Sequence, residues 1–70
     1  FDAGLSKREI EIIEMACREL SSSEIAERLF IAVRTVETHR KRIMEKTNSK
    51  NFLGSILYAI RKGMVDIENL

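Results

Sequence analysis

Apolar residues recur along this chain at the three- and four-residue spacing of amphipathic α-helices. The apolar positions fall into four groups separated by short breaks. No stretch alternates apolar and polar residues over a length that would predict a β-strand. The pattern therefore predicts an all-α fold with four helices, at about residues 6–18, 22–29, 33–46 and 52–62.

The first two predicted helices begin with the same local signal. Ser6 is followed three residues later by Glu9, and Ser21 is followed in the same way by Glu24. This spacing is typical of a capping box, in which the serine hydroxyl and the glutamate carboxylate each accept a hydrogen bond from the other residue's backbone N–H. Because the second box follows the first helix at once, we expect two separate helices that meet at a sharp angle.

The third predicted helix has a narrow apolar edge, marked by Val36, Ile43 and Thr47. Its N-cap position falls on Ala32, which offers no side-chain acceptor to the N–H groups of the first turn. Asn48 follows where a left-handed residue often ends a helix. The residues that point away from the apolar edge are Arg34, Glu37, Thr38, Lys41, Arg42 and Glu45.

The fourth predicted helix has Asn51 as its candidate N-cap and Gly63 as its C-terminal stop. Its large apolar residues keep the i, i+3, i+4, i+7 spacing of one helix face, which predicts that this face packs into the core. That face consists of Leu53, Ile56, Leu57 and Ile60.

Seventy residues, 33% charged and 44% hydrophobic, are typical of one small globular domain. The chain opens on Phe1 instead of methionine, so we interpret it as a fragment of a longer protein. Residues 1–4 are then a linker remnant, residues 5–65 the domain and residues 66–70 a C-terminal tail.

The chemistry open to this chain is limited. Cys17 is the only cysteine and His39 the only histidine, which excludes an internal disulfide and a zinc site of nitrogen and sulfur ligands within one chain. A glycine-rich phosphate loop and a nucleophile elbow are also missing. We therefore expect no enzyme activity, no metal and no cofactor. No apolar run approaches the roughly 18 residues of a membrane helix, which predicts no membrane partner. The single cysteine suggests a reducing compartment, and we expect a cytoplasmic location. These residues contain no signal peptide, but the missing upstream part could hold one.

The net charge of +1 hides an uneven distribution. Residues 1–33 carry four basic and seven acidic residues, whereas residues 34–50 carry six basic and two acidic ones. Attraction to phosphates fades within a Debye length of about 10 Å, so a local basic patch matters more than the total charge. The distribution indicates a nucleic-acid contact centred on the third helix.

Three exposed residues of that helix can form contacts with base edges. Glu37 can accept a hydrogen bond from cytosine, Thr38 can bond a base edge or touch a thymine methyl, and Lys41 can donate to guanine. Positions three and four apart are neighbours on a helix, so these residues share one arc. The basic residues that flank the arc and suit phosphates are Arg34, Arg40, Lys46 and Lys50.

The same residues allow a simpler interpretation. Glu37 and Lys41 have the spacing of an ordinary ion pair on a solvated helix face. The alternative function is a helical protein-interaction module whose basic helix binds an acidic partner. His39 fits either a structural role or a phosphate contact.

Four segments add a family resemblance: LSKREIEII, SSSEIAERLFI, RTVETHRKRIMEK and YAIRKG. In this order and spacing, from about Leu5 to Val65, the chain resembles the LuxR/FixJ-type (GerE-like) helix-turn-helix domain. The resemblance implies that the second and third helices form the helix-turn-helix and that the third enters the major groove of double-stranded DNA.

The resemblance also implies roles for single residues. By motif position, Glu37, Thr38 and Lys41 would face bases. The residues near phosphates would be Arg34, Thr35, His39, Arg40, Arg42, Lys46 and Lys50. The fourth helix would form a homodimer contact through Ser55, Tyr58, Ala59 and Lys62.

Domains of this family usually form the C-terminal part of a bacterial transcription regulator, such as a two-component response regulator, under the control of an upstream regulatory domain. RNA polymerase is a further candidate partner. This chain departs from the family pattern at Ala32 (usually serine), Thr47 (leucine), Asn48 (glycine), Phe52 (arginine) and Gly54 (an acidic or amide residue).

Overall fold

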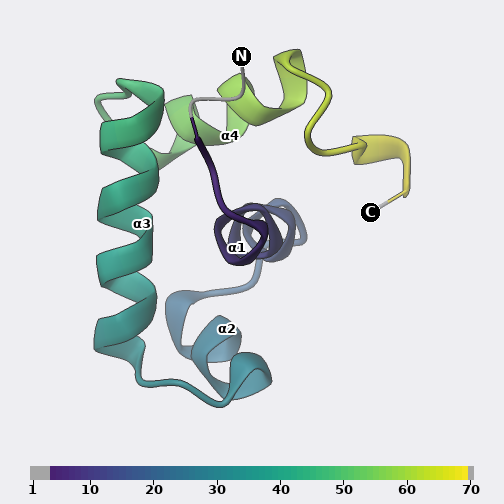
Figure 1. Ribbon diagram of the computed structural model, residues 1–70. Helices are drawn as coiled ribbons and strands as arrows, with labels where there is room; N and C mark the ends of the chain where they lie inside the picture. The colour runs from purple at the N-terminus through teal and green to yellow at the C-terminus, as the bar shows by residue number, and fades with distance from the viewer. Residues whose placement is uncertain (1–3, 70) are drawn as a thin grey trace.

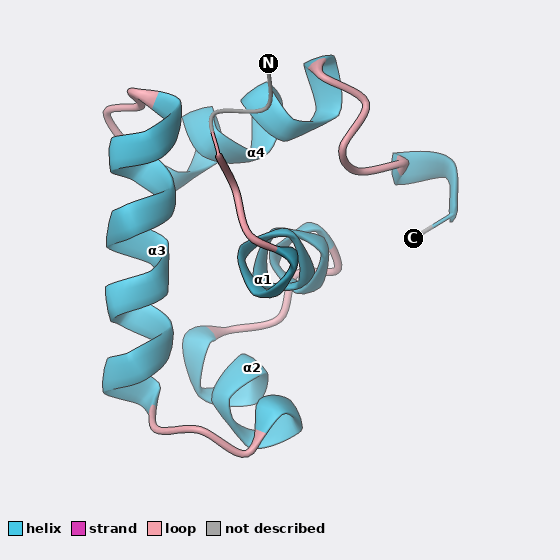
Figure 2. Cartoon of the chain, viewed as in Figure 1, coloured by secondary structure: helices cyan, strands magenta, loops and turns pink. Residues whose placement is uncertain are grey.

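The computed structural model describes residues 4–69 and contains four α-helices. They are α1 (Lys7–Cys17), α2 (Ser22–Leu29), α3 (Val33–Thr47) and α4 (Phe52–Arg61), followed by the short 3-10 helix η1 (Ile67–Asn69). Within this described range there is no strand (Figure 2). The predicted all-α class is confirmed, and every predicted helix end lies within one residue of the observed end. Of the linker predicted at residues 1–4, only Gly4 falls in the described range.

Helix α1 lies at the centre of the molecule and contacts each of the other three α-helices. Figure 1 looks along its axis, with α3 upright on the left, α2 below and α4 above. Side chains that are completely or almost completely withdrawn from solvent come from all four helices: Ile12, Ile13, Ile25, Ala26, Val36, Ile43 and Ala59. One core therefore fixes α3 by its inner edge while its outer side faces away from the other helices.

Both predicted capping boxes are confirmed. The Ser6 hydroxyl accepts from the N–H of Glu9 (3.1 Å), and the Ser6 N–H donates to the Glu9 carboxylate (2.8 Å). Ser21 and Glu24 form the same pair of bonds at the same distances. The backbone and hydroxyl groups of Ser21 hold the pKa of the Glu24 carboxyl below its usual value. These two caps define where α1 and α2 begin.

Two helices end on a residue in the left-handed conformation. Asn48 ends α3 with a φ of 53°, as predicted, and Phe30 ends α2 with a φ of 57°. The left-handed region costs an ordinary side chain about 1–2 kcal/mol, and a phenylalanine there is uncommon. Phe30 is 94% exposed. Phe30 thus forms the sharp turn that carries the chain from α2 into α3.

The predicted core face of α4 is wrong at Leu53 and Leu57, whereas Ile56 packs against the core. Leu53 and Leu57 are 62% and 42% exposed, and the buried residues are Phe52, Ser55 and Ala59. Ile56 and Ile60 are half-buried. The hydroxyl oxygens of Ser55 and Thr47 are 3.0 Å apart and form a hydrogen bond. Because α4 is apolar on more than one side, this contact with α3 and the small size of Ser55 and Ala59 decide which side turns inward.

Candidate nucleic-acid interface

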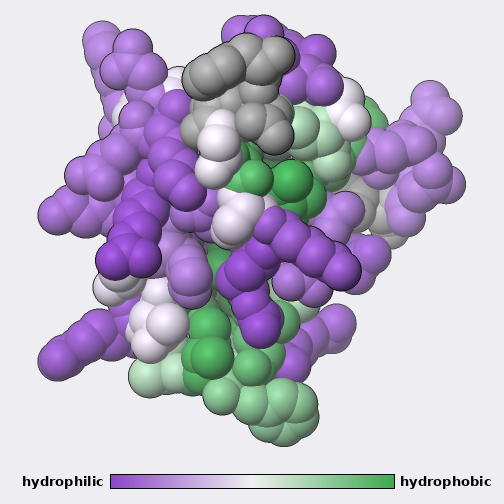
Figure 3. All heavy atoms as spheres, viewed as in Figure 1, coloured by the Kyte–Doolittle hydropathy of each residue, from purple (hydrophilic) through white to green (hydrophobic). Residues whose placement is uncertain are grey.

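The outer side of α3 is open to solvent along its length. Its inner edge is the predicted one, with Val36, Ile43 and Thr47 buried. The exposed residues of the helix include Arg34, Thr35, Glu37, Thr38, Lys41, Arg42 and Glu45. Figure 3 shows hydrophilic residues covering the left side of the molecule, where Figure 1 places α3. The basic helix therefore has the free surface that a groove contact requires.

The three predicted base-reading residues all lie on this surface. Thr38 donates its hydroxyl hydrogen to the carbonyl of Arg34 (3.0 Å), which leaves its oxygen lone pairs and its methyl group for an outside partner. Glu37 does not pair with Lys41. Its Oε2 lies 3.8 Å from Nε of Arg40. The Glu37–Lys41 ion pair that the simpler interpretation expects is therefore not formed, and Lys41 is exposed.

The predicted phosphate-contacting residues fall into different environments. Arg34, Thr35, Arg42 and Lys50 are exposed. Arg40 is half-buried, and its guanidinium carbon lies 4.1 Å from the centre of the Phe52 ring. Half-buried His39 has its Nδ1 atom buried without a hydrogen-bond partner among the described residues. One edge of its ring therefore packs into the fold, as the structural interpretation of this residue expects.

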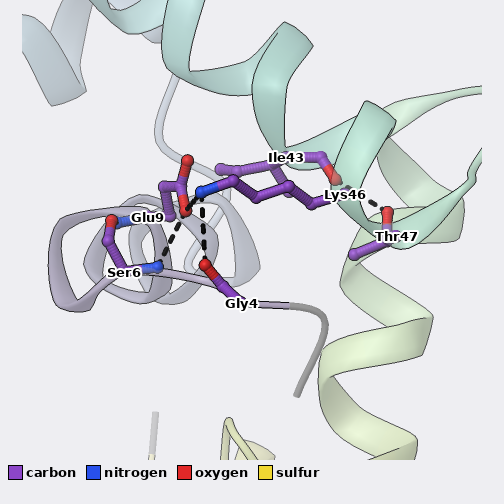
Figure 4. A network of polar contacts seen from close by, with 6 residues as sticks. All are labelled: Gly4, Ser6, Glu9, Ile43, Lys46 and Thr47. Atoms are coloured by element: carbon purple, nitrogen blue, oxygen red, sulfur yellow. Dashed lines mark hydrogen bonds and ion pairs between the residues drawn. The ribbon is translucent and has the colours of Figure 1, made fainter. Parts of the chain in front are cut away.

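The Lys46 ammonium is engaged within the fold although 37% of its side chain is exposed, and we withdraw it as a phosphate contact. Its Nζ lies 2.8 Å from Oε1 of Glu9 and 3.2 Å from the carbonyl oxygen of Gly4. Figure 4 shows the side chain crossing from α3 to the start of α1. The physical reason is Glu9, whose side chain is only 4% exposed. A buried carboxylate needs a nearby cation, since an unpaired charge is costly to remove from water.

Sequence reasoning missed this role of Glu9. Burial alone would raise the pKa of its carboxyl, but the bonds from Lys46 and Ser6 outweigh burial and hold the pKa below its usual value of 4.5. A signal was present in the sequence. Glu9 precedes Ile12 and Ile13 by three and four residues, so it lies on the same helix face as the two isoleucines. A carboxylate on a core-facing stripe predicts a buried partner.

The predicted dimer-contact residues need a correction as well. Ser55 and Ala59 are completely buried and cannot touch a second chain. Tyr58 is half-buried and Lys62 is exposed, with its Nζ 5.8 Å from the centre of the Tyr58 ring. The apolar side chains that α4 does expose are Leu53 and Leu57.

Residues 4–69 contain neither a metal-binding cluster nor a membrane-spanning helix. Nowhere in this range do three or more His, Cys, Asp or Glu side chains gather as metal ligands. None of its helices combines the length and the apolar character needed to cross a bilayer.

Comparisons with known proteins agree with this arrangement. Residues 3–59 match the family model described as "Bacterial regulatory proteins, luxR family". The chain is 44% identical over 62 residues to the oxygen regulatory protein NreC of Staphylococcus carnosus (strain TM300), covering 89% of this chain and 29% of that protein. NreC of Staphylococcus epidermidis (strain ATCC 12228 / FDA PCI 1200) is 40% identical over the same length. The chain thus spans less than a third of these relatives.

Among solved structures, the transcription factor GerE superposes with a TM-score of 0.88 at 28% sequence identity, covering 90% of this chain and 94% of that one. The family match, the similar relatives and the shared fold support the same conclusion. The chain belongs to the luxR family of bacterial regulatory proteins and is a helix-turn-helix, DNA-binding domain of a transcription regulator.

Proposed function

We propose that this domain recognises a specific double-stranded DNA sequence by placing α3 in the major groove. The observation that carries the proposal is the division of α3 into a buried edge (Val36, Ile43, Thr47) and a solvent-exposed outer arc (Glu37, Thr38, Lys41). The major groove is about 12 Å wide and admits an α-helix. A helix held firmly by one edge can enter the groove with the other.

In this proposal the outer arc supplies the base contacts, and residues on either side supply the phosphate contacts. Glu37, Thr38 and Lys41 read bases. The exposed phosphate ligands are Arg34, Thr35, Arg42 and Lys50, with His39 and Arg40 held closer to the fold. Ala32 provides no side-chain cap to α3, so the N–H groups of its first turn are suited to a phosphate.

We further propose that two copies bind together through α4. Leu53 and Leu57 lie one helical turn apart and are the exposed apolar residues of this helix. Of the residues predicted for the contact, Tyr58 and Lys62 remain available on another side of α4, and the buried Ser55 and Ala59 are left out of it. An exposed pair of leucines is a small interface, so the dimer would be stable mainly on a DNA site with two half-sites.

The wider context is also a proposal. The matched relatives are more than three times as long as the matched segment, which supports a longer response regulator whose regulatory domain controls this one. RNA polymerase would be a partner if the regulator activates transcription. The alternative, a module whose basic helix binds an acidic protein, lacks a specific observation in its favour.

Selection of bound sequences from random duplexes tests the proposal directly, and Lys41→Ala tests the division of roles. With the selected site in hand, Lys41→Ala should cost about 1–3 kcal/mol at one base position and relax the preference there. Arg42→Ala is the matched control, because a lost phosphate contact weakens all sequences about equally. Binding is measured by fluorescence anisotropy on the selected duplex and its single-base variants. Identical behaviour of the two variants would contradict the assigned roles, and an unselective pool would contradict the function.

Leu57→Glu tests the proposed dimer. The charge should lower the affinity for a duplex with two half-sites by about 1–2 kcal/mol and leave a single half-site unaffected, because Leu57 contributes only between protomers. Ile67→Glu, at another exposed apolar position outside α4, is the control. Equal losses on one and two half-sites would remove α4 from this role.

A further inference from the structure

Three residues form a continuous chain of contacts from α4 to the outer arc of α3. The ring of Phe52, the first residue of α4, lies under the guanidinium of Arg40 at 4.1 Å. Nε of Arg40 lies 3.8 Å from the carboxylate of Glu37, one turn earlier on α3. Exposure rises along the chain: Phe52 is 9% exposed, and the side chains of Arg40 and Glu37 are 26% and 58% exposed.

We propose that Phe52 and Arg40 are positioning residues for base recognition, with Phe52 fixing Arg40 and Arg40 fixing the carboxylate of Glu37. The inference rests on the proposed function and deepens it. An exposed ion pair between neighbouring turns is weak by itself, because both side chains lose freedom when they pair. A guanidinium that already lies on an aromatic ring has lost much of that freedom, so the pair forms at a lower entropic cost.

Arg40 also has an electrostatic part in this arrangement. The carboxylate of Glu37 would enter a groove lined by phosphates, and like charges repel there. A cation held 3.8 Å away offsets the repulsion. The ring covers one face of the guanidinium, and the N–H groups at its edge can still donate. Without the ring, the arginine could leave Glu37 for a phosphate, and the carboxylate would lose both its orientation and its compensating charge.

The contact itself can be tested without DNA. Ring currents should shift the NMR signals of the Arg40 side chain upfield in the wild-type chain. Phe52→Leu keeps an apolar side chain at this position and removes the ring, so the shift should disappear. Phe52→Tyr should retain it. Signals that do not respond to Phe52→Leu would overturn the inference at its first step.

The effect on recognition is measured as base discrimination. The base pair read by Glu37 is the position at which Glu37→Gln loses its preference. At that position, Phe52→Leu and Arg40→Lys should each lower the discrimination ratio by about threefold to tenfold, with other positions unchanged. Phe52→Tyr should keep the wild-type ratio, and the double variant Phe52→Leu/Arg40→Lys should lose no more than the stronger single one. Arg18→Lys, the same substitution at an exposed arginine at the end of α1, is the charge-matched control.

The outcomes separate this inference from the function on which it rests. If the wild type selects a sequence and Glu37→Gln changes it, but Arg40→Lys and Phe52→Leu do not, only the inference fails. Uniform losses at all positions would also overturn it, because they indicate a phosphate contact. If Phe52→Leu does not fold, Arg40→Lys alone provides the test, since Arg40 is only half-buried and lysine keeps its charge. A wild type without sequence preference would overturn the function and the inference together.

Discussion

Lys46→Met is expected to lower the free energy of unfolding by about 2–3 kcal/mol. The substitution leaves the carboxylate of Glu9 buried without the cation that lies 2.8 Å from it. Removing one partner of a fully buried pair costs roughly 3–5 kcal/mol. We expect less because the Lys46 side chain is 37% exposed and water can partly replace it. For a domain of this size, such a loss is a large part of the total stability.

Urea or thermal unfolding measures this effect, and two variants control it. Lys7→Met changes an exposed lysine at the start of α1 and should be nearly neutral. The double variant Lys46→Met/Glu9→Gln should recover part of the loss, because it no longer buries an unpaired charge. If Lys46→Met is as stable as the wild type, the pair is only a surface contact and Lys46 becomes available again as a phosphate ligand.

The pH dependence of stability provides a second test of the ion pair between Lys46 and Glu9. The folded-state pKa of Glu9 is lowered, so its contribution is complete above the unfolded-state value and is lost as the pH falls below about 4.5 towards the folded-state pKa. In Lys46→Met the buried carboxylate of Glu9 has lost its cation, so its protonation stabilises the folded protein. The destabilisation caused by the variant should therefore shrink in acid. Glu24 also has a lowered pKa but is present in both proteins and cancels in the difference.

The second large effect is the loss of DNA affinity with salt. Three exposed cations of α3 and the following loop are proposed phosphate contacts: Arg34, Arg42 and Lys50. Each neutralised phosphate releases counterions, so the logarithm of the binding constant should fall with a slope of about −3 against the logarithm of salt concentration. One domain should lose about 40-fold in affinity between roughly 50 and 200 mM salt, and two domains bound together about 2,000-fold.

Single substitutions make the salt titration specific to the proposed surface. Lys50→Gln should reduce the magnitude of the slope by about 0.9. Lys46→Met should leave the slope unchanged wherever the domain remains folded, because the Lys46 ammonium is bound to Glu9. A flat titration, or no binding to duplex pools at low salt, would favour the alternative in which the basic helix binds an acidic protein.

The sequence determined the elements of this protein because their signals are local. The capping boxes of Ser6 and Ser21, the stop at Asn48 and the helical spacing of apolar residues each depend on residues within one or two turns. Helix ends, the all-α class and the outward direction of Glu37, Thr38 and Lys41 follow from those signals. On α3 the apolar edge is narrow, so only one orientation buries it.

Only the tertiary structure decided the contacts between residues far apart in the sequence. On α4 two sides are apolar, and the bond between Ser55 and Thr47 selected the one that local spacing did not favour. Lys46 and Arg40 have the same charge as the cations proposed to contact phosphates and lie on the same helix. Their positions instead depend on partners at Glu9 and Phe52, 37 and 12 positions away, because burial and the pairing of charges are settled only when the helices pack together.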